Sequence, residues 1–166
     1  MIVLIGPMGA GKTTVGGLVA ARLGVSVRDT DQDVEASQGR AISEIFVDDG
    51  EELFRSLERA AVAEALATHD GVLSLGGGAV LDPDTRALLE GHDVVFLRVG
   101  LADAVKRVGL GTSRPLLLGN VRSRIKALLD ERTPIYESVA TLVVDTDDRS
   151  PQSIADEIVA ELGARA

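Results

Sequence analysis

The stretch Gly6-Pro7-Met8-Gly9-Ala10-Gly11-Lys12-Thr13 decides the fold of this chain. It matches the G-x-x-x-x-G-K-[ST] pattern and lies between an apolar run, Ile2 to Ile5, and a stretch with helical periodicity from Thr13 to Leu23. Glycines let the backbone turn its N–H groups toward a β-phosphate, beside the positive end of the following helix. The loop, with Gly9, Ala10, Gly11, Lys12, Thr13 and Thr14, therefore predicts a nucleotide site, in which Lys12 reaches the β and γ oxygens and Thr13 binds Mg²⁺.

Outward from this loop, short apolar runs alternate with helical patterns. The further runs are Val25 to Val27, Val72 to Leu75, Val94 to Val99 and Thr141 to Val144. The further helical stretches are Glu51 to Ala67, Pro83 to Glu90, Leu101 to Val108, Arg122 to Tyr136 and Pro151 to Leu162. This alternation predicts a doubly wound α/β fold with a parallel sheet and helices on both faces.

Length and composition limit the classes of protein. The 166 residues suit one domain (1–166), and no linker or repeat divides them. The absence of cysteine excludes disulfides and thiolate zinc sites, and a net charge of −9 argues against nucleic acid as a partner. The first residues lack the basic lead-in of a signal peptide, and no apolar run approaches membrane-spanning length. We expect a cytoplasmic protein.

Two carboxylates follow the second apolar run, at Asp29 and Asp31. Ligands gather at the carboxyl ends of strands in open parallel sheets. Asp29 could therefore hold Mg²⁺ through water, while Asp31 accepts a hydrogen bond from an acceptor hydroxyl. Alternatively, one of them only caps a helix that begins near Gln32. Asp145 also ends an apolar run, and spacing alone does not separate it from Asp29 as the metal ligand.

A second group of candidates could recognise an anionic substrate. Arg55 and Glu58 lie at i and i+3 of a helical pattern, so Arg55 could clamp a carboxylate while Glu58 orients it, or the two could form a surface ion pair. Gly76, Gly77 and Gly78 end the third apolar run, where bare backbone could touch a ligand or simply turn.

Three more arginines complete the candidates. Arg114 lies in a stretch of about 109–121 that has three glycines and no clean period, and that reads as a lid over the nucleotide. Arg132 could give a second carboxylate contact or face water. Arg149 could stack on adenine or pair with neighbouring Asp side chains.

Taken in order along the chain, these residues resemble the shikimate kinase family of phosphate-loop proteins. The resemblance rests on the loop, Asp29-Thr30-Asp31, Gly50-Glu51 with Phe54-Arg55 and Glu58, Gly76-Gly77-Gly78, Arg114-Pro115-Leu116-Leu117, and Arg132 with Pro134, Tyr136 and Ala140. It implies transfer of the ATP γ-phosphate to the 3-hydroxyl of shikimate, on the route to aromatic amino acids. It also implies a five-stranded sheet in the order 2-3-1-4-5, a substrate-binding segment at about 32–60 and a mobile lid.

The resemblance also assigns roles. It makes Asp31, Arg55, Arg132, Gly77 and Gly78 shikimate contacts, with Asp31 facing the reacting hydroxyl. It makes Lys12 and Arg114 the pair that neutralises the transferring phosphoryl group. It favours Asp29 over Asp145 for the metal and places Arg149 beside adenine.

Two other functions stay open on the sequence. A gluconate kinase of the same fold would keep the nucleotide half, although Arg55, Arg132 and the three glycines favour a rigid cyclic acid. A nucleotide-binding switch without catalysis would keep the loop as well. We expect a monomer that binds ATP and shikimate and binds neither nucleic acid nor membrane.

Overall fold

The computed structural model describes residues 1–109 and 118–164. Five parallel strands form one sheet in the order β2-β3-β1-β4-β5, which confirms the predicted topology. The strands are β1 (Ile2–Ile5), β2 (Val27–Asp29), β3 (Val72–Ser74), β4 (Asp93–Arg98) and β5 (Leu142–Asp145). Strand β1 is central, so the phosphate loop that follows it opens between its neighbours β3 and β4.

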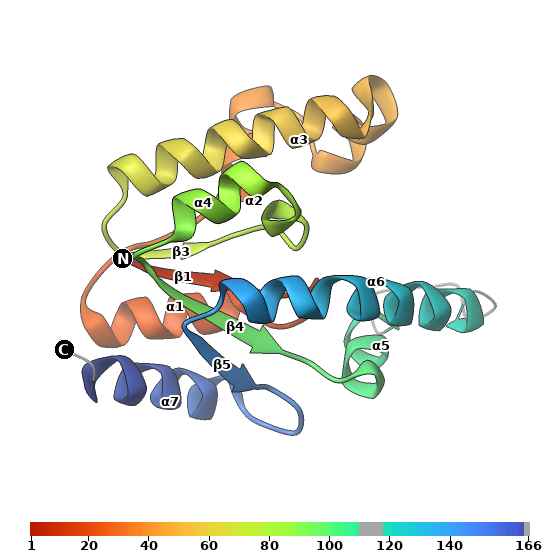
Figure 1. The fold of residues 1–166 in the computed structure, drawn as a ribbon. Coiled ribbons are helices and arrows are strands. Elements are labelled where there is room, and N and C mark those ends of the chain that lie inside the picture. Colours follow the sequence, from red (N-terminus) through yellow and green to blue (C-terminus); the bar gives the residue numbers. More distant parts are fainter. Residues whose placement is uncertain (110–117, 165–166) are drawn as a thin grey trace.

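Helices cover both faces of this sheet (Figure 1). They are α1 (Lys12–Leu23), α2 (Thr30–Gln38), α3 (Ile42–Thr68), α4 (Pro83–Leu89), α5 (Leu101–Gly109), α6 (Leu118–Val139) and α7 (Pro151–Ala164), with a 3₁₀ turn, η1, at Ala79–Leu81. Helices α1 and α7 lie together on one face, and α3, α4 and α6 pack on the other.

Successive residues of the central strands point into two separate cores. In β1, Leu4 packs with α1 and α7, whereas Val3 and Ile5 pack with α3, α4 and α6. Because both faces are covered, these strands are continuous apolar runs rather than alternating ones. The sheet is thereby held rigidly, and its carboxyl edge provides a fixed platform for the loops that follow it.

The predicted element bounds shift at two places that matter for the site. Strand β2 begins at Val27 rather than Val25 and extends through Asp29, which places Asp29 at the end of the strand. Helix α3 begins at Ile42, nine residues earlier than predicted, and contains a kink at Gly50 with φ 86° and ψ 169°. Only glycine adopts this conformation without strain, which ends one helix and starts the next within α3.

Helix α2 and the first part of α3 have a small core of their own. Val34, Ile45 and Phe54 are buried there, and the rings of Phe46 and Phe54 pack at a tilt with their centroids 4.8 Å apart. These helices correspond to the segment of about 32–60 that the sequence predicted to bind substrate. This small core, which is separate from the two large cores, holds α2 and the first part of α3 beside the edge of the sheet.

Candidate active site

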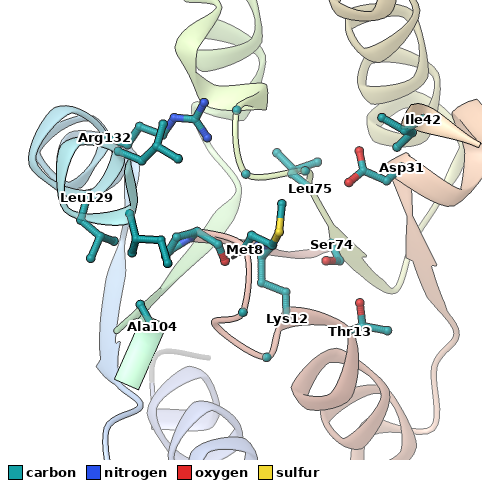
Figure 2. A pocket seen from close by; sticks show the side chains of 18 of the residues that line it. Met8, Lys12, Thr13, Asp31, Ile42, Ser74, Leu75, Ala104, Leu129 and Arg132 are labelled. Carbon is teal, nitrogen blue, oxygen red and sulfur yellow. Dashed lines mark hydrogen bonds between the residues drawn. The ribbon is translucent and has the colours of Figure 1, made fainter. Parts of the chain in front are cut away.

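A cavity of about 700 Å³ lies at the carboxyl edge of the sheet. The phosphate loop forms its floor, the end of β2 and helix α3 form one wall, and α6 forms the other. Figure 2 shows Arg132 on one side and Asp31 on the other, with Met8 and Lys12 between them. The cavity is therefore large enough, and polar enough at its centre, to hold a small acceptor beside a phosphate.

The backbone of the phosphate loop requires its glycines. Gly9 and Gly11 have φ of 82° and 90°, and Gly11 is the N-cap residue of α1. A Cβ at Gly6 would lie 2.8 Å from the carbonyl oxygen of Leu97 in β4. Ala10, predicted to touch the nucleotide, is buried beneath the loop. The loop thus wraps around the start of α1, where helix N–H groups favour an anion.

Lys12 rises from the first turn of α1 and folds over this loop. Its ammonium nitrogen donates to the carbonyls of Gly6, at 2.6 Å, and Pro7, at 2.9 Å. Burial lowers its pKa to about 8, although the carboxylates of Asp31 and Asp29 act in the opposite direction. A partly desolvated cation beside a loop of glycines is suited to a phosphate oxygen.

Asp29 performs the capping role that the sequence left open and faces Thr13 as well. Its Oδ1 accepts from the backbone N–H of Asp31, at 2.9 Å, and of Gln32, at 3.3 Å, which caps α2. Its Oδ2 lies 3.4 Å from the Thr13 hydroxyl. One carboxylate oxygen orders the helix, while the other joins a threonine hydroxyl to form a pair of hard oxygen ligands.

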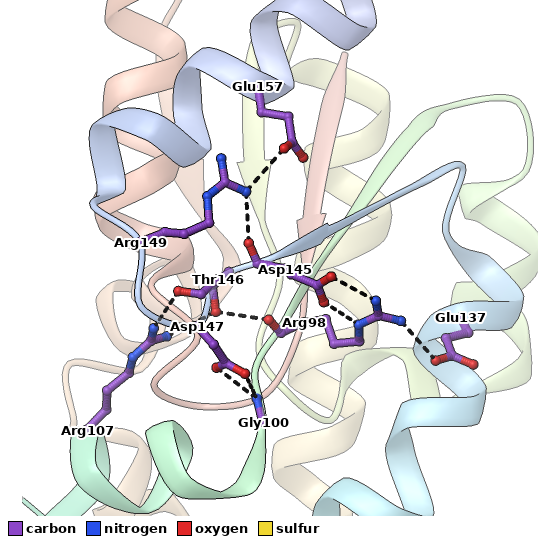
Figure 3. A network of polar contacts seen from close by, with 9 residues as sticks. All are labelled: Arg98, Gly100, Arg107, Glu137, Asp145, Thr146, Asp147, Arg149 and Glu157. Carbon is purple, nitrogen blue, oxygen red and sulfur yellow. Dashed lines mark hydrogen bonds and ion pairs between the residues drawn. The ribbon is translucent and has the colours of Figure 1, made fainter.

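Asp145, the alternative metal ligand, is paired with Arg98. Its carboxylate forms two hydrogen bonds with the Arg98 guanidinium, at 2.6 and 3.0 Å (Figure 3). These bonds lower the pKa of Asp145, and its side chain does not line the cavity. The geometry therefore favours Asp29 as the carboxylate near Thr13.

Asp31 lies in the cavity wall with an altered acidity. Burial raises its pKa to about 6, and the nearby negative charges of Asp29 and Glu58 add to the rise. The carboxylate lies against Gly76, where a Cβ would come within 2.6 Å of Oδ1. A carboxylate of this acidity can accept a hydrogen bond from a hydroxyl and take its proton near neutral pH.

Arg55 and Glu58 do not form a surface ion pair, because Glu58 is buried and Arg55 is partly buried. Arg55 Nη1 donates to Glu58 Oε1 at 2.9 Å, and Glu58 is only 4% exposed. Burial raises the pKa of Glu58, and the bond from Arg55 opposes that rise. Gly78 lies against the guanidinium, since a Cβ there would be 2.5 Å from Nη1. Glu58 and Gly78 thus fix the position of Arg55 in the cavity wall.

Arg132 comes from the opposite wall, on α6, and lies beside Gly77. A Cβ at Gly77 would be 3.6 Å from Arg132 Nη1, and the Gly77 carbonyl accepts a hydrogen bond from Tyr136. The buried Nε of Arg132 has no protein acceptor among the described residues. The structure therefore brings together Arg55, Arg132, Gly77, Gly78 and Asp31 around one cavity.

Besides the buried Ala10, two predicted residues are not placed in the cavity. Arg149 lies outside its lining and donates to the Asp145 carbonyl and to Glu157 (Figure 3). It also donates to the carbonyl of Ser153. Its ion-pair partner is Glu157 and not a neighbouring aspartate, and its approach to adenine stays a prediction. Arg114 and most of the expected lid, 109–121, lie outside the described residues.

Sequence reasoning missed Arg107. Its guanidinium donates to the carbonyl of Gly9, at 3.0 Å. It also donates to the carbonyl of Thr146, at 3.0 Å (Figure 3). It thereby ties α5 to the phosphate loop and to the turn after β5. In the sequence it is one basic residue in an amphipathic helix, with an Asp four positions earlier, so no local signal distinguishes it.

Comparison with known proteins agrees with this geometry. The family model described as "Shikimate kinase" matches residues 8–163. A shikimate kinase of Thermobifida fusca is 60% identical over 164 residues, which are 99% of this chain and 95% of that protein. The structure of shikimate kinase from Acinetobacter baumannii in complex with shikimate superposes with a TM-score of 0.91 at 34% identity, over 99% of this chain and 93% of that one.

A gluconokinase structure from Sinorhizobium meliloti is much less similar. It has a TM-score of 0.62 at 21% identity, and the match covers 99% of this chain and 92% of that one. This likeness shows a shared fold alone. It gives the gluconate alternative no support beyond the common architecture.

Proposed function

The chain belongs to the shikimate kinase family and transfers the γ-phosphate of ATP to the 3-hydroxyl of shikimate, and on this premise we propose which residues carry out each part of the reaction. The products are ADP and shikimate 3-phosphate, on the route to aromatic amino acids. The observation that carries the proposal is the convergence of two arginines and one carboxylate on the cavity that the phosphate loop floors.

Arg55 and Arg132 bind the carboxylate of shikimate. They approach the cavity from α3 and α6, and both are oriented by neighbours rather than by solvent: Arg55 by Glu58, and Arg132 by its packing beside Gly77. The planar fork of an arginine matches a carboxylate with two parallel hydrogen bonds. Gly77 and Gly78 line the same cavity, and in this proposal their backbone N–H groups complete the acceptor site.

Asp31 orients the hydroxyl that is phosphorylated. Its raised pKa, about 6, leaves the carboxylate ionised at neutral pH and basic enough to accept the hydroxyl proton as the oxygen attacks. Attack places the new O–P bond in line with the bond that breaks between the γ-phosphorus and the β-γ bridging oxygen. The proton then resides on Asp31 Oδ until it exchanges with water.

Lys12 and the phosphate loop hold the nucleotide. The N–H groups at the start of α1 cradle the β-phosphate, and Lys12 neutralises charge on the β and γ oxygens. Arg114 supplies a second positive charge to the transferring group from outside the described residues. Arg149 borders adenine in this proposal.

The residues present fit Mg²⁺. Among residues 1–109 and 118–164, no group of three His, Cys, Asp or Glu side chains converges on one point. A nucleotide-bound Mg²⁺ needs fewer protein ligands, since phosphates and waters fill most of its positions. Thr13 would hold it directly and Asp29 through water, which agrees with the 3.4 Å between their oxygens. When bound, Mg²⁺ neutralises the β and γ oxygens of ATP.

We further propose a cytoplasmic monomer of one domain with a lid at about 109–121. The sequence has no cysteine and a net charge of −9, which suits a reducing compartment and disfavours nucleic acid. No helix in the described part of the chain is both long and apolar enough to cross a bilayer. Sedimentation of the purified chain tests the monomer.

The test of the substrate is ADP release with ATP and Mg²⁺ in the presence of shikimate, gluconate, AMP or no acceptor. The expected result is a rate that depends on shikimate alone, with a phosphate monoester of shikimate detected by mass spectrometry. ADP release that depends on gluconate or AMP would show that the acceptor is that compound and not shikimate. Nucleotide binding without any acceptor-dependent rate would support a nucleotide-binding switch without catalysis.

A further inference from the structure

Tyr136 connects helix α6, which carries Arg132, to the glycine turn that follows β3. It is the one tyrosine of the chain, it lies on α6 one helical turn after Arg132, and it is 1% exposed. Its ring packs on Phe96 of β4, with centroids 4.9 Å apart. The ring belongs to the core that α3, α4 and α6 cover, and the hydroxyl bonds to Gly77, a residue that lines the cavity.

The hydroxyl makes a specific contact with the glycine turn. It donates to the carbonyl oxygen of Gly77 at 2.5 Å. Burial raises the pKa of this hydroxyl, and the positive charge of Arg132 offsets only part of the rise, so the group stays protonated and remains a donor at neutral pH. The Gly77 carbonyl is therefore fixed by a side chain that the core holds rigidly.

Fixing this carbonyl also fixes the next N–H group. The peptide bond between Gly77 and Gly78 is planar and trans, so the Gly78 N–H points opposite to the Gly77 carbonyl. Neither the Gly77 N–H nor the Gly78 N–H donates to a protein acceptor among the described residues. A glycine turn is otherwise free to rotate its peptide planes, because no side chain restricts them.

We propose that Tyr136 is a positioning residue for shikimate, which holds the 77–78 peptide so that its N–H faces the substrate and keeps the turn in register with Arg132. This inference rests on the proposal that Gly77, Gly78 and Arg132 contact shikimate. The Tyr136 side chain thereby fixes two proposed shikimate contacts relative to each other: the 77–78 peptide in the turn after β3, and Arg132 on helix α6. Without the hydroxyl, the turn samples several peptide orientations, and part of the binding energy is lost in ordering it.

The test compares Tyr136→Phe with Thr141→Val. The first removes the hydroxyl and keeps the ring on Phe96. The second removes a hydroxyl that also bonds to a backbone carbonyl, that of Val94 at 3.1 Å, at the start of β4 and away from the cavity. Each variant is measured for shikimate affinity by calorimetry, ADP affinity, KM for both substrates, kcat and melting temperature.

We expect Tyr136→Phe to raise the dissociation constant and KM for shikimate by about five- to tenfold, as for loss of one hydrogen bond. The KM for ATP and the affinity for ADP stay within about twofold of the wild-type values, a change that corresponds to less free energy than the loss of one hydrogen bond. Thr141→Val lowers the melting temperature without changing shikimate affinity. Unchanged shikimate affinity in Tyr136→Phe, or an equal loss for both ligands, overturns the inference.

Arg132→Lys separates this result from failure of the proposed site. If Arg132→Lys weakens shikimate binding and Tyr136→Phe does not, the site stands and only the role of Tyr136 is refuted. If neither variant affects shikimate binding, the acceptor site itself is wrong and the inference falls with it.

Discussion

The carboxylate of Asp31 lies directly against the α-carbon of Gly76, so that a Cβ at position 76 would come within 2.6 Å of Asp31 Oδ1. No side chain fits between them. The glycine after β3 therefore makes room for the acidic residue after β2, and the ends of these two neighbouring strands meet at the cavity.

Gly76→Ala should impair the acceptor site and spare the nucleotide site. The added methyl group forces the Asp31 carboxylate away from the turn. When a group that orients a reacting hydroxyl is displaced by about 1 Å, the rate can fall on the order of 100-fold. We expect that loss in kcat/KM for shikimate, with ADP affinity unchanged.

Gly17→Ala is the matched control for this substitution. Gly17 lies inside α1, and a Cβ there meets nothing within 4 Å. The change should raise stability by about 0.5–1 kcal/mol without changing kcat/KM. Equal activity of the Gly76→Ala enzyme and the wild type would show that Asp31 does not need this position.

The pH dependence of acceptor turnover should report Asp31. Its pKa is about 6, mainly because of burial, so the ionised form that accepts the hydroxyl proton is lost as the pH falls through 6. The value of kcat/KM for shikimate, measured at saturating Mg-ATP, should fall about tenfold per pH unit below that point. A midpoint near 4 would mean that the carboxylate is solvated or uninvolved.

Asp31→Asn should stabilise the fold while removing activity. The folded pKa of about 6 exceeds the unfolded value of 3.8, so the ionised carboxylate costs folding free energy. The cost is absent below pH 4, grows between pH 4 and 6, and is complete above pH 6. After discounting for the partial exposure of the carboxylate, the variant should gain about 1 kcal/mol at pH 7.

Thermal melts at two pH values check this sign. A gain of about 1 kcal/mol corresponds to about 3 °C for a chain of this size. The gain should appear at pH 7 and vanish at pH 4. A variant that melts below the wild type at pH 7 would show that Asp31 stabilises the fold, contrary to its raised pKa.

Nucleotide affinity should weaken as Lys12 loses its proton. Burial lowers the pKa of Lys12 to about 8 in the free protein, so the cation that meets the phosphates is lost above that pH. We expect ADP affinity without metal to decline between pH 8 and 10, and Lys12→Met to bind weakly at every pH. Constant wild-type affinity across that range would place the phosphate contact elsewhere.

Two carboxylates compared in parallel test the metal assignment. Asp29→Asn should weaken the binding of Mn²⁺ to the complex of the protein with ADP by about tenfold, as expected when a residue that contacts the metal through water is lost. Asp145→Asn should not, because Asp145 is bonded to Arg98 outside the cavity. Electron paramagnetic resonance measures the affinity for Mn²⁺. The reverse pattern would restore Asp145 as the ligand.

The sequence predicted much of the fold because its strongest signals are local. The loop from Gly6 to Thr13 and the buried apolar strands mark the sheet by pattern alone. The start of α3 at Ile42 was missed because its N-cap, Ala41, makes no side-chain capping bond, and the glycine kink at Gly50 interrupts the period. Neither feature leaves a recognisable signature in one sequence.

The site was predictable where residue type and strand end coincide, as for Asp29, Asp31 and the three glycines. The rest depends on contacts between distant segments. Arg107 reaches Gly9 across 98 positions, and Tyr136 reaches Gly77 across 59. Whether Glu58 is a buried partner of Arg55 or a surface one also depends on how α3 packs, which helical spacing cannot reveal.

The most direct test of the account is the shikimate dependence of ADP release, measured in the wild type and in Asp31→Asn beside shikimate affinity by calorimetry. We predict that ADP release depends strongly on shikimate in the wild type. In Asp31→Asn the shikimate-dependent rate should fall by about 100-fold or more, since a positioned proton acceptor typically contributes 10²- to 10⁴-fold. The variant should still bind shikimate. An Asp31→Asn enzyme that turns over shikimate at the wild-type rate would contradict the central role of this carboxylate.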